Sequence, residues 1–472
     1  MQTRAPLASW YALAAVSIAV LYSVIDRQVL ILLSQPLKAD LHLSDAQIGS
    51  LQGLGAALFT AIAAVPLGWL ADRIDRRRLL AACILIWSAA IACCGLATGY
   101  WSLLLCVAFL AAGEAGLTPI VFALIPEIFP ERQRVSANFI FFAAVIVGSG
   151  LGIALAGAVI DHIGLVARWF PDGLFSRQTW RMVFVVVAVP GLFMTLAILL
   201  IRKQQNATPV RADASATSLL ERPQILGYLT SHWRAVVGIF VPSGMVALGM
   251  TAVFTWLPVI LMRRFSTTPS QVGTGLGVAV AAGTLMGLAC AAAGAKFMRP
   301  KWGMATPLRL LLIGYLVLAL LTPLYLVAGS PNEFFLIAWV QMTAVIGGNS
   351  LMPTMLQDMA PANLRGRVFA ISTVITTVFQ VISPITVGLL SDHLFTQAGG
   401  LLLSSISVAG PGFLLAAIAL WLGETHILKT VAEVIALSNI AGSQPDASSF
   451  GASAATTALR ENADPVFLTK HP

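Results

Sequence analysis

Charged residues are scarce in this chain of 472 residues. Asp, Glu, Lys and Arg together make up only 10% of it and hydrophobic residues 58%, whereas ordinary soluble domains carry about 25% charged residues. So few charged side chains cannot cover the surface of a folded chain of this length in water. A soluble globular domain is therefore excluded, and the chain belongs in a lipid bilayer.

Cysteine and histidine are also sparse, and their placement argues against a metal site. The six histidines fall in loops or near the chain end, and no His-Glu-x-x-His pattern occurs. The glycines at 148–157 and 273–277 lack the Lys-Ser/Thr ending that phosphate binding needs. The five cysteines lie in apolar runs without the spacing of a disulfide framework or zinc site; they are Cys83, Cys93, Cys94, Cys106 and Cys290. We expect no metal, no cofactor and no ATPase motor.

Long apolar runs are what the chain has in abundance. A membrane-spanning helix needs about 20 mainly apolar residues, and twelve runs meet that length. They are residues 10–34, 47–71, 78–97, 101–125, 136–160, 181–201, 235–261, 271–295, 305–328, 333–356, 367–390 and 401–423. The sequence therefore predicts an all-α integral membrane protein with twelve transmembrane helices.

The basic residues alternate between the connecting segments and predict the orientation. Of the 28 Lys and Arg residues, 21 fall on the side of the two termini, six fall on the opposite side, and the last is Arg27. The positive-inside rule then places both termini in the cytoplasm. This distribution explains the net charge of +8 without nucleic-acid binding. The first apolar run is full length and shows no signal-peptide cleavage site, so we expect it to remain as the first span. A compact chain without glycosylated outer loops fits a multi-pass protein of a bacterial inner membrane.

Internal repetition divides the chain into two pseudo-symmetric halves of six helices. Ser44 and Gln47 before the second span recur as Thr268 and Gln271 before the eighth, at an offset of 224, and both pairs read as helix capping boxes. The Arg-x-Arg-Val motif at 132–135 recurs at 365–368, at an offset of 233. We expect a first half at 1–201, a cytoplasmic linker at 202–234, a second half at 235–423 and a largely disordered cytoplasmic tail at 424–472. Repeats of this kind are typical of secondary transporters.

Three charges lie inside the apolar spans of the first half: Asp26, Arg27 and Glu114. A charge at the centre of a membrane helix costs roughly 2.5 to 3.5 kcal/mol, so such residues usually face a cavity, a partner or a substrate path. A rise of about 1.5 Å per residue puts Asp26 and Glu114 within about 7 Å in depth. They could line one cavity and exchange protons, or form a static network that only holds the first half together.

The segment 68–78 reads Gly-Trp-Leu-Ala-Asp-Arg-Ile-Asp-Arg-Arg-Arg. It resembles the signature of the major facilitator superfamily, Gly-x-x-x-Asp-Arg-x-Gly-Arg-Arg, which lies between the second and third helices. The resemblance implies the two-halved fold of that family and a latch that holds one access state. The latch residues that follow from it are Gly68, Asp72, Arg73 and Arg76, with Arg365 and Arg367 as partners. Asp75 stands where the family has its glycine.

A narrower resemblance covers the first half clearly and the second half weakly. The segments 22–27 (Tyr-Ser-Val-Ile-Asp-Arg), 113–116 (Gly-Glu-Ala-Gly) and 148–152 (Gly-Ser-Gly-Leu-Gly), with Trp180-Arg181-x-x-Phe184, are similar to the Spinster-like branch of the superfamily. Members of this branch are associated with sphingolipid and lysolipid transport. Val107 stands where the branch usually has an arginine, seven residues before Glu114, and this leaves Arg27 as the buried cation.

The second half offers neutral polar residues where the first half has charge. Gln341, Asn349 and Gln380 are the candidates for substrate contact there, beside Arg27 and Tyr22 in the first half. A cavity with charge on one wall and polar or apolar groups on the other suits an amphipathic ligand.

These features together predict a secondary active transporter that works by alternating access as a monomer in membrane lipid. We expect Asp26 and Glu114 to exchange protons while Arg27 attracts a lipid-like molecule or an organic anion. Fold alone does not decide substrate, so proton-coupled uptake of a small soluble nutrient, such as a sugar or aromatic acid, is an alternative. A non-transporting receptor or scaffold is a second one. We do not expect an enzyme, because no nucleophile, base and orienting group stand together.

Overall fold

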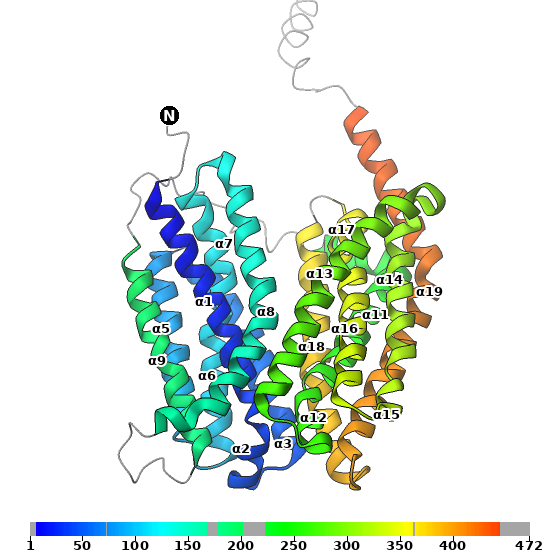
Figure 1. Ribbon diagram of the computed structural model, residues 1–472. Coiled ribbons are helices and arrows are strands. Elements are labelled where there is room, and N and C mark those ends of the chain that lie inside the picture. Colours follow the sequence, from blue (N-terminus) through cyan, green and yellow to red (C-terminus); the bar gives the residue numbers. More distant parts are fainter. Residues whose placement is uncertain (1–5, 72, 168–177, 202–221, 362–363, 444–472) are drawn as a thin grey trace, which may run out of the picture.

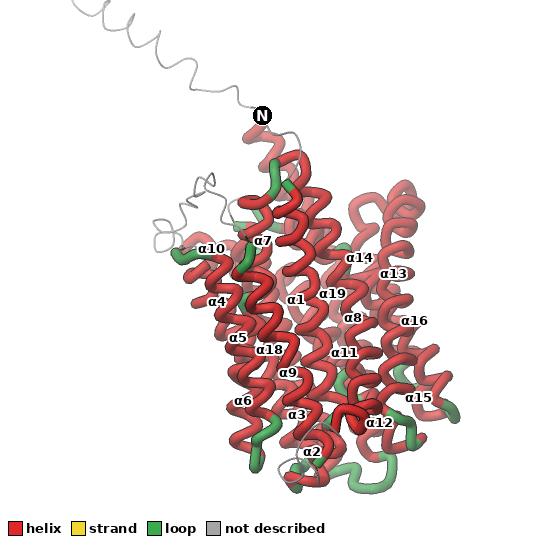
Figure 2. Tube along the Cα trace, turned by 60° about the vertical axis from the view of Figure 1, so that its left-hand side comes forward, coloured by secondary structure: helices red, strands yellow, loops and turns green. Residues whose placement is uncertain are grey.

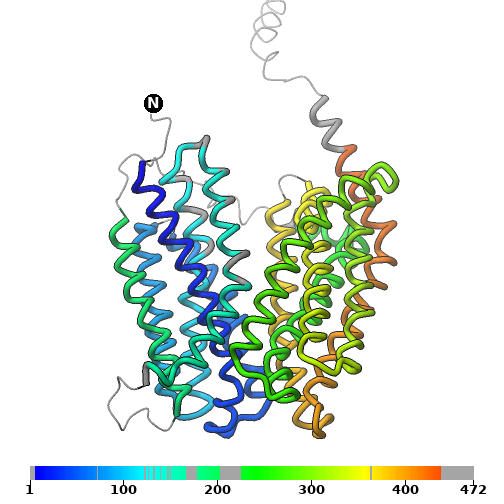
Figure 3. Tube along the Cα trace, in the orientation of Figure 1, coloured from blue at the N-terminus to red at the C-terminus, as the bar shows by residue number. Residues whose placement is uncertain are grey.

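The structure is a computed structural model that describes residues 6–71, 73–167, 178–201, 222–361 and 364–443. Helices make up every regular element of these described ranges, and no strand occurs in them (Figure 2). Figure 3 shows the first half of the chain gathered on one side and the second half on the other. The predicted all-helical fold is thus confirmed.

The first half contains six spans. They are α1 (Leu7–Leu32), the joined α3 (Asp45–Ser50), η1 (Leu51–Leu58) and α4 (Phe59–Ala71), then α5 (Arg76–Cys94), the joined α6 (Tyr100–Ala115) and α7 (Leu117–Ile128), α8 (Glu131–Ala167) and α9 (Thr179–Leu199). A short helix, α2 (Ser34–Leu41), connects the first two spans.

The second half repeats this arrangement. Its spans are α11 (Trp233–Phe254) with α12 (Leu257–Phe265), α13 (Pro269–Trp302), α14 (Thr306–Leu321) with α15 (Leu324–Val327), α16 (Pro331–Asn349) with α17 (Met352–Met359), α18 (Arg365–His393) and α19 (Gly400–Ser443). The helix α10 (Arg222–Ser231) precedes it. α19 runs on through the segment that the sequence assigned to the start of the tail.

The number of spans depends on a bend within α8 and on a break between α13 and α14. Length and hydropathy give ten candidate spans in the described residues, or eleven with α8, whose two parts are bent by 42°. One candidate, Pro269–Val327, has 59 residues, which is about 88 Å of helix and far more than a bilayer needs. It is broken at Gly303, whose φ is 53°, between α13 and α14. Counting these two separately gives the twelve expected spans.

The helical bundle has two opposite faces. The terminal face is the end where α1 begins and α19 ends, and the far face is the opposite end, where α2, α3, α12 and α15 lie (Figure 1). The two halves approach each other at the far face.

The internal repeat is visible in local geometry at the far face. The side chain of Ser44 accepts a hydrogen bond from the backbone N–H of Gln47, and Thr268 accepts one from Gln271, so both capping boxes form as predicted. The residues two places before the caps, His42 and Ser266, both have φ 52°. The chain therefore enters the second and eighth spans through the same turn, at the offset of 224 that relates the two motifs.

One seam between the halves joins the second and eleventh spans. A methyl group placed on Gly49 would lie 2.1 Å from the carbonyl oxygen of Pro384, and one on Gly53 would lie 2.2 Å from that of Val381. One on Gly388 would lie 2.4 Å from the carbonyl oxygen of Asp45. Glycine is required at these three places because the backbones approach so closely.

The other seam joins the fifth and eighth spans and is a copy of the first. A methyl group on Gly273 would lie 2.6 Å from the carbonyl oxygen of Ile153, one on Gly277 2.4 Å from that of Gly150, and one on Gly157 2.3 Å from that of Pro269. Each contact corresponds to one in the first seam. Residues of the eighth span are numbered 224 higher than their equivalents in the second, and residues of the eleventh 231 higher than their equivalents in the fifth.

Toward the terminal face the second and eleventh spans separate. α18 packs against α3 and η1, the far-face part of the second span, whereas α4 packs against α6 and α7 of its own half. Val65 on α4 and Val374 on α18 are 76% and 62% exposed. The two halves are thus held together at the far face and parted at the terminal face.

Candidate functional site

An ion pair joins the first and fourth spans inside the first half. Arg27 near the end of α1 donates a hydrogen bond from Nε to Oε2 of Glu114, which lies near the end of α6. The side chain of Arg27 is 52% exposed and that of Glu114 only 2%. The side chain of Arg27 therefore reaches accessible space, while its counter-ion is buried in the helix packing.

Asp26, the neighbour of Arg27, points into the interior and is fully buried. Among the described residues neither of its carboxyl oxygens has a hydrogen-bond partner, and the same holds for Oε1 of Glu114. Asp26 interacts electrostatically with the carboxyl group of Glu114, with the indole of Trp87 and with the hydroxyl of Tyr22. Burying an ionised carboxylate without a partner is costly, so the protonation state of this carboxyl group is the central question at the site.

The charge balance of the cluster bears on this question. The cluster brings two carboxyl groups together with one guanidinium, and the partner of this guanidinium within the described part of the chain is Glu114. Two ionised carboxylates would leave a net negative charge in the membrane interior. A single proton on one of the two carboxyl groups would remove that charge.

Tyr22 belongs to this cluster rather than to an accessible surface. Its ring is 6% exposed and its hydroxyl is buried without a described partner. The structure brings Tyr22, Asp26, Arg27 and Glu114 together in one region of α1 and α6. Trp87 on α5 was missed, since an aromatic residue in an apolar span carries no separate signal.

The three candidates of the second half are in different environments. Gln341 is fully buried; its side-chain oxygen accepts from the hydroxyl of Tyr325 at 3.1 Å, and its amide donates to the hydroxyl of Thr322 at 3.0 Å. These bonds hold α16 against α14 and α15, so we leave Gln341 out of the proposed binding surface. Asn349 is exposed and accepts from Tyr315 at 3.2 Å, and Gln380 on α18 is exposed.

The described residues of the predicted latch lie at the terminal face, and each contact described for them stays within one half. The guanidinium of Arg73 stacks over Trp69 at 3.7 Å from the ring centre, and Arg76 pairs with Glu127. Arg365 donates to the carbonyl oxygens of Gln357 and Ala360 at 3.0 and 3.2 Å. Gly68 has open space around it, Arg367 has an interaction of its own, and Asp72 lies outside the described residues.

Asp75 has a role that the signature does not give. Its carboxylate caps α5 by accepting from the backbone N–H of Arg77 at 3.0 Å, and it pairs with the guanidinium of the same residue at 2.8 Å. Its φ is −58°, so this position needs no glycine here. The hydrogen bonds from Arg77 lower the pKa of Asp75 from its ordinary value.

The comparison with known proteins now identifies the family. A family model described as Major Facilitator Superfamily matches residues 16–384. The chain belongs to this superfamily. It is 23% identical over 447 residues to an MFS-type efflux pump of Mycolicibacterium smegmatis, and the match covers 91% of this chain and 95% of the pump.

Similarity to Spinster proteins appears in both sequence and structure. The chain is 27% identical over 230 residues to protein spinster homolog 3 of Mus musculus, and the match covers 47% of this chain and 41% of that protein. Its fold resembles that of a bacterial homolog of the human lysosomal transporter Spinster, solved in an inward-facing and unoccupied conformation. The TM-score is 0.71 at 21% identity, over 91% of this chain and 98% of the other. This superfamily member is thus a multi-pass membrane transporter and not an enzyme.

Proposed function

We propose that this superfamily member is a secondary active transporter that couples substrate movement to protons through Asp26 and Glu114. The observation that carries the proposal is the buried carboxyl of Asp26, which has no described hydrogen-bond partner and lies beside the Arg27–Glu114 pair. Because the cluster has one cation for two acids, binding and release of one proton changes its net charge. A substrate that competes for Arg27 changes the same balance, and this links the two events.

Arg27 is the substrate-facing member of the cluster. Its side chain is half exposed, and an anionic head group could take the place of Glu114 on its guanidinium, because guanidinium groups bind carboxylate and phosphate in the same geometry. We assign the opposite wall to the second half, where the side chains of Asn349 and Gln380 are exposed. Charge on one wall and neutral groups on the other support an amphipathic lipid-like molecule or an organic anion as substrate.

The arrangement of the halves supports alternating access. Close contacts join them at the far face, and the second and eleventh spans part toward the terminal face. With the termini in the cytoplasm of a bacterium, this is the inward-open state of a monomer. The latch of Asp72, Arg73 and Arg76 with Arg365 and Arg367 closes that face in the other state; in this state Arg76 and Arg365 make contacts within their own halves.

Uptake into liposomes tests the proposal. The purified protein is reconstituted under an imposed pH gradient and offered lysolipids, sphingoid bases, sugars and aromatic acids. We expect uptake of an amphipathic or anionic compound that collapses when the gradient is dissipated, and an apparent affinity at least about tenfold lower in Arg27→Gln, since a charge-assisted pair is lost.

Arg299→Gln is the matched control, because Arg299 is an exposed arginine at the terminal end of α13. It should leave uptake unchanged. Uptake of sugars alone, or an Arg27→Gln variant that transports like Arg299→Gln, would overturn the substrate assignment.

A further inference from the structure

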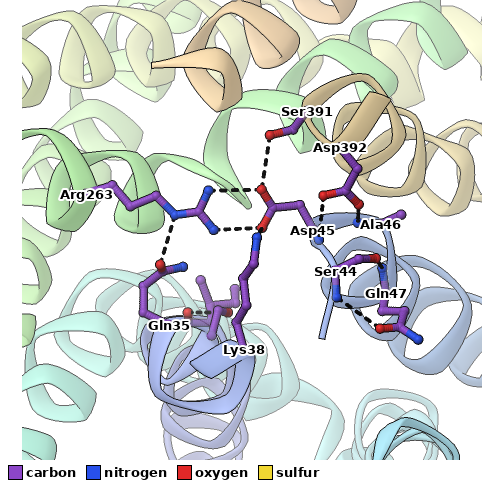
Figure 4. Close-up of polar contacts among 11 residues, drawn as sticks. Gln35, Lys38, Ser44, Asp45, Ala46, Gln47, Arg263, Ser391 and Asp392 are labelled. Carbon is purple, nitrogen blue, oxygen red and sulfur yellow. Dashed lines mark hydrogen bonds and ion pairs between the residues drawn. The ribbon is translucent and has the colours of Figure 1, made fainter. Parts of the chain in front are cut away.

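An acid of the second half caps a helix of the first half at the far face. The carboxylate of Asp392, near the end of α18, accepts hydrogen bonds from the backbone N–H groups of Asp45 and Ala46 at 3.1 and 2.7 Å (Figure 4). These N–H groups belong to the first turn of the second span, where no carbonyl of the same helix can reach them. A negative charge at this end of a helix is also favoured by the helix dipole.

In turn, an acid of the first half caps a helix of the second half. The carboxylate of Asp161, on α8 of the first half, accepts from the backbone N–H of Ser270 in the first turn of α13 at 3.0 Å. Asp161 and Asp392 are related by the offset of 231, and Ala46 and Ser270 by the offset of 224. These are the offsets of the two glycine seams, so each seam ends at the far face in an inter-half helix cap.

The two caps differ in what surrounds them. Asp45, whose side chain is 4% exposed, accepts two hydrogen bonds from the guanidinium of Arg263 at 2.7 and 2.9 Å, one from Lys38 at 2.6 Å and one from Ser391 at 3.0 Å (Figure 4). Arg263 and Ser391 come from the second half and Lys38 from the first. In the other seam the position of Asp45 is taken by Pro269, which can form no ion pair.

We propose that Asp161 and Asp392 are paired latches of the far-face gate, and that the Asp45–Arg263 ion pair strengthens the Asp392 side alone. This inference rests on the proposed transport cycle, in which the far face must open in turn. Opening removes the carboxylate from each helix end and leaves the first-turn N–H groups to water. The seam of Asp161 has the more exposed cap and, among the residues that the structure describes, no ion pair. It is the weaker seam and parts first.

The distance between the halves tests the gate without any substrate. Nitroxide labels are placed on the far face at Ala39 and Gln397, and on the terminal face at Ile74 and Met304, all exposed positions, in the full chain with its native cysteines replaced. In Asp392→Ala we expect the far-open population to rise about tenfold, as loss of a charged cap would give, while the terminal-face distance shortens. Asp392→Asn keeps one of two acceptor oxygens and should give a smaller shift.

Asp40→Ala is the matched control. Asp40 is also a far-face acid, on α2, but it accepts from Gln178 and Trp180 of its own half at 2.7 and 3.2 Å. It should leave both distance distributions as in the wild type. Asp161→Ala should give a shift smaller than that of Asp392→Ala, and the double variant the largest.

If Asp392→Ala fails to fold, Asp161→Ala decides, since its exposed site tolerates change. Wild-type distance distributions in the alanine variants would overturn the proposal, and so would an equal shift in Asp40→Ala. Because the readout needs no transport, a wrong proton-coupling assignment would leave this result unchanged, and the two proposals fail separately.

Discussion

The substitution Gly49→Ala is expected to push the far face of the protein open. A methyl group on Gly49 would lie 2.1 Å from the carbonyl oxygen of Pro384, and real contacts of this kind essentially never fall below 3.0 Å. The two backbones must therefore separate by about 0.9 Å or more at this point. The partner atom is a backbone oxygen that no rotamer change can move away.

The size of the effect follows from the cost of overpacking. Forcing a methyl group into a packed interface costs about 1 to 3 kcal/mol, and this penalty applies only while the seam is closed. The ratio of far-open to far-closed molecules should therefore rise by about 5- to 150-fold. Gly273→Ala should act in the same direction on the other seam, where the added methyl group would lie 2.6 Å from the carbonyl oxygen of Ile153.

Label distances between the halves at the far face are the assay, and Gly164→Ala is the control. Gly164 is also a helical glycine, on α8, but outside its own helix backbone and chain neighbours no described atom lies within 4 Å of a methyl group placed there. Its replacement should leave the distances unchanged and raise stability slightly, since alanine is the better helix former. Identical distance distributions for Gly49→Ala and Gly164→Ala would refute the idea that the glycine seam holds the far face closed.

Two further predictions concern single side chains. Gln341→Leu should lower the free energy of unfolding by about 1 to 3 kcal/mol, because it leaves the buried hydroxyl of Tyr325 without its partner, and should leave substrate affinity unchanged. Gln380→Leu should instead lower substrate affinity and leave stability unchanged. Melting curves and uptake measurements distinguish the two variants. Asp75→Ala should cost about 1 kcal/mol through loss of the α5 cap, and Asp75→Asn less. Arg77 lowers the pKa of Asp75 in the folded protein, so the stability that the Asp75 carboxylate contributes is fully present above about pH 4, its pKa in the unfolded chain, and is lost as the pH falls through the folded pKa. Unfolding curves of the wild type and Asp75→Ala should therefore converge at low pH.

The parts of this structure that the sequence predicted are those with local causes. Ser44 and Thr268 cap their helices through residues three places on, so their pattern was visible in the chain. The spans follow from apolar length in the same way. Asp26, Arg27 and Glu114 could be grouped because their depths follow from helix rise.

Which way a side chain faces across the bundle was harder to predict. Gln341 and Gln380 look alike in an apolar run, yet one is fully buried against Thr322 and Tyr325 and the other is exposed. The difference depends on which neighbouring helix lies against each face, and this is set by packing between distant segments.

The far-face caps were missed for a related reason. Asp392 bonds to residues almost 350 positions away, and no local pattern marks such a contact. A signal did exist, since Asp161 and Asp392 recur at the same offset as the glycines of the two seams. Extending the comparison of the halves from the helix starts to the helix ends would have found it.

Proton movement into liposomes tests the coupling role of Asp26 and Glu114 most directly. A pH dye inside the vesicles reports protons while the transported compound is added outside, for wild type, Glu114→Gln and the control Glu333→Gln. Glu333 is exposed in the first turn of α16, where its carboxylate accepts from the backbone N–H of Gly329 at 2.8 Å. We expect a substrate-dependent pH change in the wild type and the control that disappears in Glu114→Gln. Substrate movement in the wild type with no pH change would contradict the account, and Glu114 would then be structural.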